Sequence, residues 1–580
     1  MDMVNIKING MEYSVPASAT VLEAARFANI DIPTLCYLKD INKVGSCRMC
    51  LVEIKGGRAL QAACVYPVSE GMEVFTNTPA VREARRVNLE LILSNHDRNC
   101  LSCVRNRNCE LQKLAEEMNI DEIPFEGESK HLPIDDLSPS IVRDNNKCIL
   151  CRRCVAACRE NQAVGVIGPT ERGFQTHIAC AFEAKLGESP CISCGQCITV
   201  CPTGALTEKD DTGKVWAALH DPEKYVVVQT APSVRATLGE CFGLPIGTNV
   251  EGKMAAALRR LGFDKVFDTD FGADLTIMEE ATELLGRIQN GGVLPMFTSC
   301  SPGWVKYLEH HFPEMIPNMS TCKSPMEMEG AIIKTYYAEK TGIDPANIVV
   351  VAVMPCTSKK FEAQRPEMVV NGMRAVDVSL TTRELARMIR DARIDFARLP
   401  DEECFDELVA QSTGAAPIFG VTGGVMEAAL RTAADVLENR SVENVEYHEV
   451  RGLAGIKEAT FTLGGKELKV AVANSTGAAK ELIQRIKAGD ASYAFVEVMA
   501  CPGGCVNGGG QPIVSAYKRM DVDPRAARAA GLYAEDESKT IRKSHENPDI
   551  QKLYAEFLGE PNGHLAHKLL HTEYIDRSDG

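Results

Sequence analysis

The chain has 580 residues, 45% hydrophobic and 24% charged, so it is long enough for several domains with large cores, and wholesale disorder or a collagen-like structure is excluded. The formal net charge of −16 argues against nonspecific nucleic-acid binding, and no segment approaches the ~20 apolar residues of a membrane span. Residues 1–10 lack the basic start and apolar run of a signal peptide. These features predict a cytoplasmic protein that binds neither nucleic acid nor membrane.

The 23 cysteines are the most informative part of the composition, because most of them lie in short runs. Disulfides need an oxidising compartment, whereas runs of cysteine in a reducing compartment are typical of metal ligands. We therefore expect several metal sites.

Residues 1–80 alternate short β-type runs with glycine turns, and the stretch 20–28 predicts a helix with Thr20 as its N-cap. The pattern indicates a small α+β module. It holds the set Cys36, Cys47, Cys50 and Cys64. Two close cysteines with two flanking ones suit a [2Fe–2S] cluster, although the spacing departs from the plant-type pattern. A structural zinc ion is the alternative.

Residues 81–125 change to a helical pattern that a cysteine-rich loop interrupts. The candidate ligands there are His96, Cys100, Cys103 and Cys109. Such a set binds either zinc or a His-ligated [4Fe–4S] cluster, and the other cluster sets of this chain favour the cluster. Together with the preceding module, this set resembles the N-terminal part of the iron–sulfur subunit of respiratory complex I. An electron-relay subunit is therefore one alternative function.

Residues 140–210 contain two similar cysteine runs, which indicate an internal duplication. The runs are Cys148, Cys151, Cys154 and Cys158, and Cys191, Cys194, Cys197 and Cys201. Their x2-x2-x3 spacing matches the bacterial ferredoxin run, in which the fourth cysteine of each run ligates the other cluster. We expect two [4Fe–4S] clusters, with Cys201 completing the first set and Cys158 the second. Zinc is again the alternative.

Residues 222–515 alternate apolar strands and helical segments in α/β fashion, with buried strands expected at 226–228 and 348–353. Three segments of this region, 298–304, 354–362 and 497–512, resemble the signature segments of [FeFe]-hydrogenases. The helical and polar tail, 516–580, is similar to the small-subunit segment of that family.

The resemblance implies a multidomain α+β and α/β fold. Its parts would be a β-grasp [2Fe–2S] ferredoxin-like module, a His/Cys3 module, a two-[4Fe–4S] ferredoxin-like module, an α/β iron-hydrogenase catalytic domain and a helical small-subunit-like tail. The implied activity is reversible H2 oxidation and proton reduction at an H-cluster, which is a [4Fe–4S] cubane joined to a diiron subsite with CO, CN⁻ and a bridging dithiolate. One [2Fe–2S] and three [4Fe–4S] accessory clusters would relay electrons.

The resemblance also implies partners. Because the chain shows no flavin or pyridine-nucleotide fingerprint, we expect ferredoxin or flavin- and NAD(P)-linked iron–sulfur subunits to exchange electrons with it. An H2 sensor is a further alternative, although no segment resembles a signalling domain.

The family's motifs assign roles to residues of the large domain. By position, Cys505 bridges the cubane and the diiron subsite, and Cys356 and Cys501 are further cubane ligands. Lys359 is the expected charged hydrogen-bond donor to a cyanide, with Ser233 as a further contact. Met354 and Met499 are packing groups beside the subsite.

One position departs from the family, which usually has two adjacent cysteines where this chain has Cys300 and Ser301. In the family the first cysteine relays protons and the second ligates the cubane. Strict register makes Cys300 the relay and places Ser301 at the cubane. Alternatively, Cys300 ligates iron and Ser301 or a water relays. Because a cubane prefers four thiolates, we place Cys300 on iron and leave its relay role open.

The family's proton path matches Glu280, Glu283, Arg287 and Ser320 of this chain. Glu280 and Glu283 share a helix face, which suits a relay in which neighbouring groups tune each carboxyl pKa. A solvated acidic helix face is the alternative. Four cysteines belong to no set and are expected to be buried core thiols: Cys180, Cys241, Cys322 and Cys404.

Overall fold

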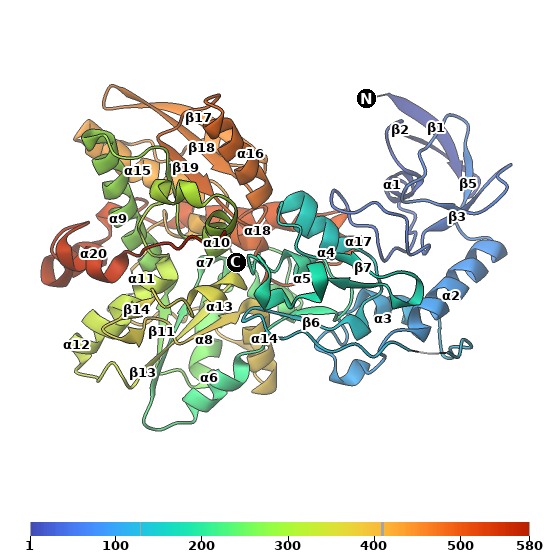
Figure 1. Cartoon of the computed structure of the whole chain (residues 1–580), viewed down its shortest axis with the longest axis horizontal. Coiled ribbons are helices and arrows are strands. Elements are labelled where there is room, and N and C mark those ends of the chain that lie inside the picture. The colour runs from blue at the N-terminus through green and yellow to red at the C-terminus, as the bar shows by residue number, and fades with distance from the viewer. Residues whose placement is uncertain (1, 128, 408–410, 579–580) are drawn as a thin grey trace.

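The computed structural model describes residues 2–127, 129–407 and 411–578. Figure 1 shows small N-terminal modules at one end of the molecule and a large domain at the other, with the helices of the C-terminal tail against the large domain. In the described ranges no helix is both long and apolar enough to cross a lipid bilayer.

The first module is a five-stranded sheet in the order β2-β1-β5-β3-β4 with one helix. Its elements are β1 (Met3–Ile8), β2 (Met11–Pro16), α1 (Val21–Phe27), β3 (Leu51–Ile54), β4 (Gln61–Ala62) and β5 (Glu73–Phe75). Ile6 and Ile8 are buried whereas Lys7 between them is exposed, the alternation of a half-buried strand. The predicted Thr20 cap is confirmed, because Thr20 and Glu23 form a reciprocal capping box at the start of α1.

Short elements surround the cysteine loops of the next two modules. They are α2 (Pro79–Ser94), α3 (Glu110–Glu117), β6 (Ile141–Arg143), α4 (Arg153–Ala156), β7 (Gly168–Thr170), β8 (His177–Ala179), α5 (Gln196–Thr199) and β9 (Leu206–Glu208). The duplication is visible in the backbone, because Arg152 and Gly195 both have positive φ before α4 and α5. A Cβ at Gly195 would lie 2.4 Å from Thr357 Oγ1, so glycine is needed for the large domain to pack against this turn.

The large domain contains two four-stranded sheets. The all-parallel sheet has the order β11-β10-β13-β16, and the other has the order β12-β19-β18-β17 with β17 antiparallel to β18. The strands are β10 (Tyr225–Thr230), β11 (Lys265–Asp268), β12 (Met296–Phe297), β13 (Ile348–Met354), β16 (Val378–Thr381), β17 (Ile456–Leu463), β18 (Lys466–Ala473) and β19 (Phe495–Val498). The predicted buried strands at 226–228 and 348–353 are confirmed, and they pair with each other.

Helices cover these sheets, and the C-terminal tail contributes further helices. The helices of the large domain are α6 (Thr212–Leu219), α7 (Pro232–Arg235), α8 (Glu251–Leu261), α9 (Thr269–Asn290), α10 (Pro302–His311), α11 (Pro325–Ile332), α12 (Ala338–Thr341), α13 (Ser358–Glu362), α14 (Thr382–Asp391), α15 (Gly424–Glu438) and α16 (Thr476–Lys487). A hairpin of β14 (Val369–Val370) and β15 (Met373–Arg374) completes this region, and the short α17 (Ala516–Arg519) begins the tail.

The longer helices of the tail are α18 (Pro524–Ser538), α19 (Pro548–Leu553) and α20 (His564–Leu570). Buried ion pairs fasten the first of them to the large domain. Arg235 lies 2.8 Å from Glu535, and Arg431 lies 2.8 Å from Asp536. All four side chains are buried, so the tail is part of the same packed unit as the large domain.

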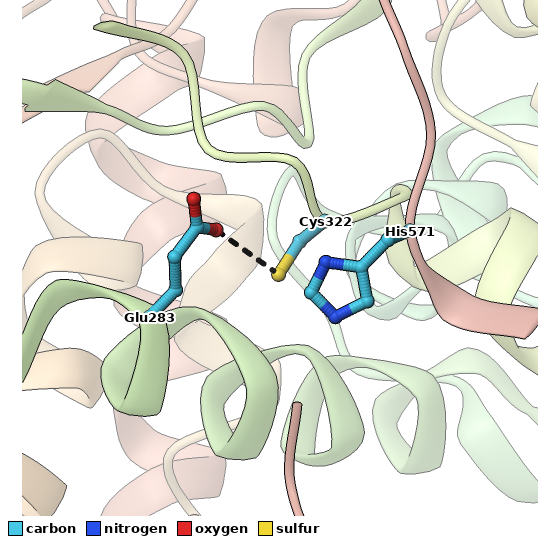
Figure 2. A group of neighbouring side chains, drawn as sticks. All are labelled: Glu283, Cys322 and His571. Atoms are coloured by element: carbon cyan, nitrogen blue, oxygen red, sulfur yellow. Dashed lines mark hydrogen bonds between the residues drawn. The ribbon is translucent and has the colours of Figure 1, made fainter. Parts of the chain in front are cut away.

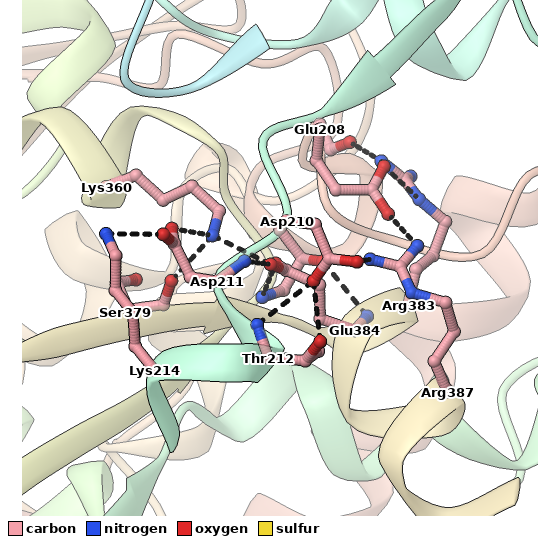
Figure 3. A network of polar contacts seen from close by, with 12 residues as sticks. Glu208, Asp210, Asp211, Thr212, Lys214, Lys360, Ser379, Arg383, Glu384 and Arg387 are labelled. Carbon is pink, nitrogen blue, oxygen red and sulfur yellow. Dashed lines mark hydrogen bonds and ion pairs between the residues drawn. The ribbon is translucent and has the colours of Figure 1, made fainter. Parts of the chain in front are cut away.

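A second group of buried charges joins the ferredoxin-like module to the large domain (Figure 3). The carboxylate of Glu208, at the end of β9, forms ion pairs with the guanidinium groups of Arg383 at 2.6 Å and Arg387 at 2.7 Å. Arg383 also donates to the backbone oxygens of Gly509 and Gln511, at 2.8 and 2.6 Å. Burial alone would raise the pKa of Glu208, but the two guanidinium groups hold it well below its usual range.

The same junction contains a buried lysine. Lys360 Nζ lies 2.6 Å from the Asp211 carboxylate and 2.9 Å from that of Glu384 (Figure 3). Asp211 lies three residues after the end of β9, whereas Lys360 and Glu384 belong to the large domain, so this cluster also ties the two parts together.

We expect Glu208→Gln to lower the free energy of unfolding at neutral pH by about 3 kcal/mol, because it leaves buried guanidinium groups without their charged partner. The lowered pKa of Glu208 contributes stability that is present above the ordinary carboxyl pKa and is lost as the pH falls. The difference between the natural chain and the variant should therefore shrink below about pH 4. Denaturant titrations at several pH values, followed by cluster absorbance and fluorescence, measure it.

Asp210→Asn is the matched control for this prediction. Asp210 is exposed and lies 3.6 Å from Arg387, so its loss should cost less than about 1 kcal/mol. Equal effects of the two variants would contradict a special role for the buried pair.

Candidate functional site

Two cysteine-lined cavities lie in the duplicated module. One is lined by Cys148, Cys151, Cys154 and Cys201, and the other by Cys158, Cys191, Cys194 and Cys197. The structure thus brings together the two crossed sets that the ferredoxin spacing predicts. Burial raises the pKa of Cys148 and of Cys191 to about 11, so a bound cation is needed to hold these thiols as thiolates at neutral pH.

The cysteines of the first module also come together. Thiols of Cys47 and Cys64 lower the pKa of Cys36 through direct contact, and Cys64 likewise lowers the pKa of Cys50. The set lies beside the module of residues 140–210 through the buried Asn42. Its amide donates to the backbone oxygen of Cys36 at 2.8 Å and to that of Cys151 at 3.0 Å.

The third set contains an orphaned imidazole. His96 Nδ1 is buried without a hydrogen-bond partner, and burial lowers the pKa of His96 to about 4. A neutral imidazole with a free nitrogen suits a metal ligand. Cys100, Cys103 and Cys109 are half-buried. Cys103 Sγ touches the backbone at Gly204, where a Cβ would lie 2.7 Å from the sulfur, so this set adjoins the loop after Cys201.

A central cavity lies where strands of both sheets end. Its lining includes Cys300 after β12, Cys356 after β13, and Cys501 and Cys505 after β19. Ligand sites in α/β proteins form at such carboxyl ends of strands. Cys194 of the neighbouring set also lines the cavity, so the ferredoxin-like module reaches its wall.

Hydrogen bonds fix this contact between the module and the cavity. Thr357 Oγ1 donates to the Ser193 oxygen at 2.7 Å, and Ser358 Oγ donates to the Ile192 oxygen at 2.9 Å. Both hydroxyls follow Cys356 directly. The loop that carries Cys194 is therefore held against the loop that carries Cys356.

Cys300 and Ser301 face different neighbours. Cys300 packs against the apolar cluster to which α9 and α15 contribute, and burial, Glu280 and Cys505 raise its pKa well above the ordinary value. Ser301 Oγ instead accepts the Ala500 N–H at 3.3 Å, beside Cys501. The two side chains thus point toward different parts of the site, Cys300 toward Glu280 and Ser301 toward the Cys501 loop.

The structure places four further predicted site residues at this cavity. Ser233, Met354, Met499 and Lys359 all line the cavity. Ser233 Oγ is buried without a hydrogen-bond partner, as a donor to an absent group would be. Lys359 is held by Glu362 at 2.7 Å, and Glu362 also accepts a bond from Ser324 at 3.1 Å.

The four predicted proton-path residues, which we call the acidic line, lie close together. Neither oxygen of Glu280 has a hydrogen-bond partner, and burial together with Glu283 raises the pKa of Glu280 to about 8. Ser320 donates to Glu283 at 2.9 Å, and Arg287 pairs with Glu283 at 2.6 Å. The line runs from a fully buried carboxyl group to a partly exposed guanidinium group.

The unassigned cysteines have different environments. Cys180 and Cys322 are buried and Cys241 is half-buried. The prediction of a buried thiol was wrong for Cys404, which is exposed in an acidic loop. Among the described residues, its thiol donates a hydrogen bond to the backbone oxygen of Glu402. A cysteine with acidic neighbours on both sides carries a sequence signal for exposure.

Sequence reasoning missed three functional positions. Asn42, and Cys194 as a cavity residue, gain their roles from contacts across modules, whereas Glu362 contacts Lys359 and Ser324 within the large domain. Only Glu362 had a local signal, its i, i+3 spacing from Lys359 on α13.

Family models match almost the whole chain. They are described as the 2Fe-2S iron-sulfur cluster binding domain (residues 1–79), the NADH-ubiquinone oxidoreductase-G iron-sulfur binding region (85–124), the 4Fe-4S dicluster domain (147–205), the iron-only hydrogenase large subunit, C-terminal domain (224–509), and the iron hydrogenase small subunit (521–577). Fold and matches define the class: a multidomain iron–sulfur oxidoreductase.

Relatives narrow this class to a family. The NADP-reducing hydrogenase subunit HndD of Solidesulfovibrio fructosivorans is 51% identical over 100% of both chains. Iron hydrogenase 1 of Clostridium pasteurianum is 46% identical over 99% of this chain and 100% of its own length. The chain belongs to the iron-only hydrogenase family.

Two further comparisons cover only part of the chain. The structure of apo [FeFe]-hydrogenase HydA1 from Chlamydomonas reinhardtii matches 63% of this chain and 99% of its own, with 43% identity and a TM-score of 0.57. Cytosolic iron-sulfur assembly component 3 of Rattus norvegicus is 32% identical over 68% of this chain and 84% of its own length.

We expect Glu280→Gln to have opposite effects on stability and turnover. The raised pKa of Glu280 means that its contribution to stability is present at low pH and is lost as the pH rises toward about 8. Gln remains neutral, so the variant should be more stable than the natural chain above neutral pH by at least about 1 kcal/mol. H2 turnover should fall by about 10²-fold or more, because the variant has no proton to transfer.

Unfolding titrations and H2 assays across the same pH range test both parts. The result expected for a structural carboxyl group, a loss of stability together with a small loss of turnover, would contradict this role of Glu280.

Proposed function

We propose that this chain catalyses the reversible conversion of H2 to protons and electrons as the catalytic subunit of a cytoplasmic, multisubunit hydrogenase. The observation that carries the proposal is the central cavity. Strand ends of two sheets bring four cysteines, a buried lysine and an orphaned serine hydroxyl to one place, beside a line of acidic groups. We propose that the domains of the chain span residues 1–80, 81–125, 140–210, 222–515 and 516–580.

The residues of the cavity fit an H-cluster. Cys356, Cys501 and Cys505 would hold it, with Cys505 as the bridging ligand. When bound, the group supplies the redox chemistry that forms or splits H2. Lys359 would donate to a cyanide, and the Glu362 carboxylate keeps its ammonium group in place. Met354 and Met499, both buried, shape the cavity and exclude water.

We assign the fourth corner of the cubane to Ser301 and the proton relay to Cys300. This strict register replaces our expectation that Cys300 binds iron. Ser301 Oγ is fixed at the Cys501 loop by the Ala500 N–H, whereas Cys300 shares its apolar surroundings with α9, the helix that carries Glu280. A thiol whose pKa is raised stays protonated and is able to pass its proton to a carboxylate.

Protons would leave Cys300 through the buried carboxyl line. Glu280 accepts and holds a proton near neutral pH because its pKa is about 8. The Ser320 hydroxyl, which donates to Glu283, would connect the two carboxyl groups. Arg287, which lies at the outer end, forms an ion pair with Glu283 on the side nearer the surface.

Electrons would use the neighbouring cysteine sets, which would hold one [2Fe–2S] and three [4Fe–4S] clusters. Specific contacts place these cysteine sets beside one another. Asn42 connects the Cys36 loop to Cys151, Cys103 touches the backbone at Gly204, and the Cys194 loop borders the central cavity. The first module and the His96 set thus both adjoin the cavity of Cys151 and Cys201.

The partners follow from the relatives and from the chain's own content. HndD is named as a subunit of an NADP-reducing hydrogenase and matches this chain over its full length. We propose ferredoxin or flavin- and NAD(P)-linked iron–sulfur subunits as partners.

Infrared spectroscopy of the fully assembled chain together with an H2 assay tests the proposed function. Bands of bound CO and CN⁻ with H2 turnover are the expected result. Clusters without these bands would instead indicate an electron-relay or iron–sulfur assembly protein. Bands with negligible turnover would favour the H2 sensor.

A pair of variants tests the Cys300 and Ser301 roles. In the chain before the diiron subsite is inserted, Ser301→Cys should change the paramagnetic resonance signal and reduction potential of the central cubane, because a thiolate replaces an oxygen. Cys300→Ser should leave that cubane and its iron content unchanged and should slow H2 turnover by about 10²-fold after assembly. Loss of central cubane iron in Cys300→Ser would reverse the assignment.

A further inference from the structure

Three side chains from separate parts of the chain converge at the outer end of the acidic line. Figure 2 shows Glu283 of α9, Cys322 and His571 pointing toward one another. One carboxylate oxygen, the Cys322 sulfur and one imidazole nitrogen all lie within 4.8 Å of each other. The Cys322 thiol faces a Glu283 oxygen at 3.9 Å.

Backbone pairing explains why these residues meet. The residues after α20 run antiparallel to the segment before α11, with Cys322 opposite His571. Thr572 N donates to the Thr321 oxygen at 2.8 Å, and Lys323 N donates to the Leu570 oxygen at 2.8 Å. The tail therefore forms one wall around the proton-path segment.

His571 has the surroundings of a proton-carrying imidazole. One ring nitrogen lies 2.7 Å from Thr321 Oγ1 and the other lies 3.0 Å from the Glu279 carboxylate. A carboxylate behind an imidazole stabilises its protonated form. Glu279 is itself fixed by the Tyr554 hydroxyl and by the Asn562 N–H at 2.7 Å.

A way to the surface continues from His571. The His571 side chain is only 2% exposed, but its ring stacks on that of His567, with centroids 4.5 Å apart. His567 is exposed on α20. A proton on His571 thus lies one side chain from solvent.

We propose that Cys322 and His571 form a second proton exit from Glu283, parallel to the one past Arg287. This proposal rests on the proposed function. In the outward step the Glu283 carboxyl O–H bond breaks and its proton goes to the Cys322 sulfur, while the Cys322 S–H proton passes to a His571 nitrogen. The carboxylate and the imidazolium remain, the thiol is restored, and no electron moves. Proton uptake runs in reverse.

The chemistry of Cys322 suits this step. Burial together with Glu283 and Glu280 raises the pKa of its thiol well above the ordinary value, so it stays a neutral S–H that accepts and donates in turn. The ionisable groups facing the pair include Glu279, Glu280, Glu283, Tyr554, His567 and Tyr574.

The first test is independent of activity. In the chain without the diiron subsite, the infrared S–H band of Cys322 is the band that Cys322→Ala removes. We expect this band to differ between the natural chain and His571→Gln, because a neutral amide accepts the thiol proton less well than an imidazole nitrogen. His564→Gln, which changes an exposed histidine on α20, is the matched control and should leave the band unchanged. An identical band in the natural chain and in His571→Gln would overturn the proposal.

The second test uses turnover of the assembled enzyme. Cys322→Ala should slow H2 turnover about twofold, since one of two exits remains, and adding Arg287→Gln should slow it by about 10²-fold. Cys322→Ser, which keeps a proton-carrying group, should restore the rate. A double variant no slower than Arg287→Gln alone would overturn the second exit. Absence of CO and CN⁻ bands would overturn the proposed function, and the S–H coupling would be measurable nonetheless.

Discussion

The structure depends on one constraint, which is that the cysteine sets must adjoin one another across the boundaries between modules. Each boundary is fixed by a specific contact beside a cysteine. Asn42 donates to the oxygens of Cys36 and Cys151, Gly204 leaves room for the Cys103 sulfur, and Gly195 lets Thr357 approach the Cys194 loop. Small or bifunctional residues occupy these places because a larger side chain would separate neighbouring sets.

Buried charges hold these boundaries where apolar packing alone would leave the register free. Glu208 joins Arg383, and Arg383 continues to the backbone of Gly509, near Cys505. The tail is fastened in the same way through Arg235 and Arg431. Removing one partner of such a pair costs far more than replacing both with apolar groups, so these contacts specify a single arrangement rather than maximise stability.

The sequence predicted the features that depend on a few neighbouring residues, but it could not predict those that depend on contacts between distant residues. The strands at 226–228 and 348–353 and the Thr20 cap follow from patterns of a few residues, and the crossed ferredoxin sets follow from spacing. Asn42 has no such pattern, because its partners are 6 and 109 residues away. Cys322 resembled a core thiol in the sequence, since only the folded tail places His571 beside it.

The pair Cys300 and Ser301 departs from the family's usual two cysteines at its second position alone. Ser301 directly precedes α10, yet its hydroxyl accepts no bond from that helix and turns to the Ala500 N–H instead. A neutral hydroxyl at this corner would carry less negative charge than a thiolate, and lower negative charge around a cluster raises its reduction potential. On the proposed assignment Cys300 would be free of iron beside Glu280, where burial keeps both groups protonated near neutral pH. The two adjacent residues would then separate the electron-holding side of the cavity from its proton-holding side.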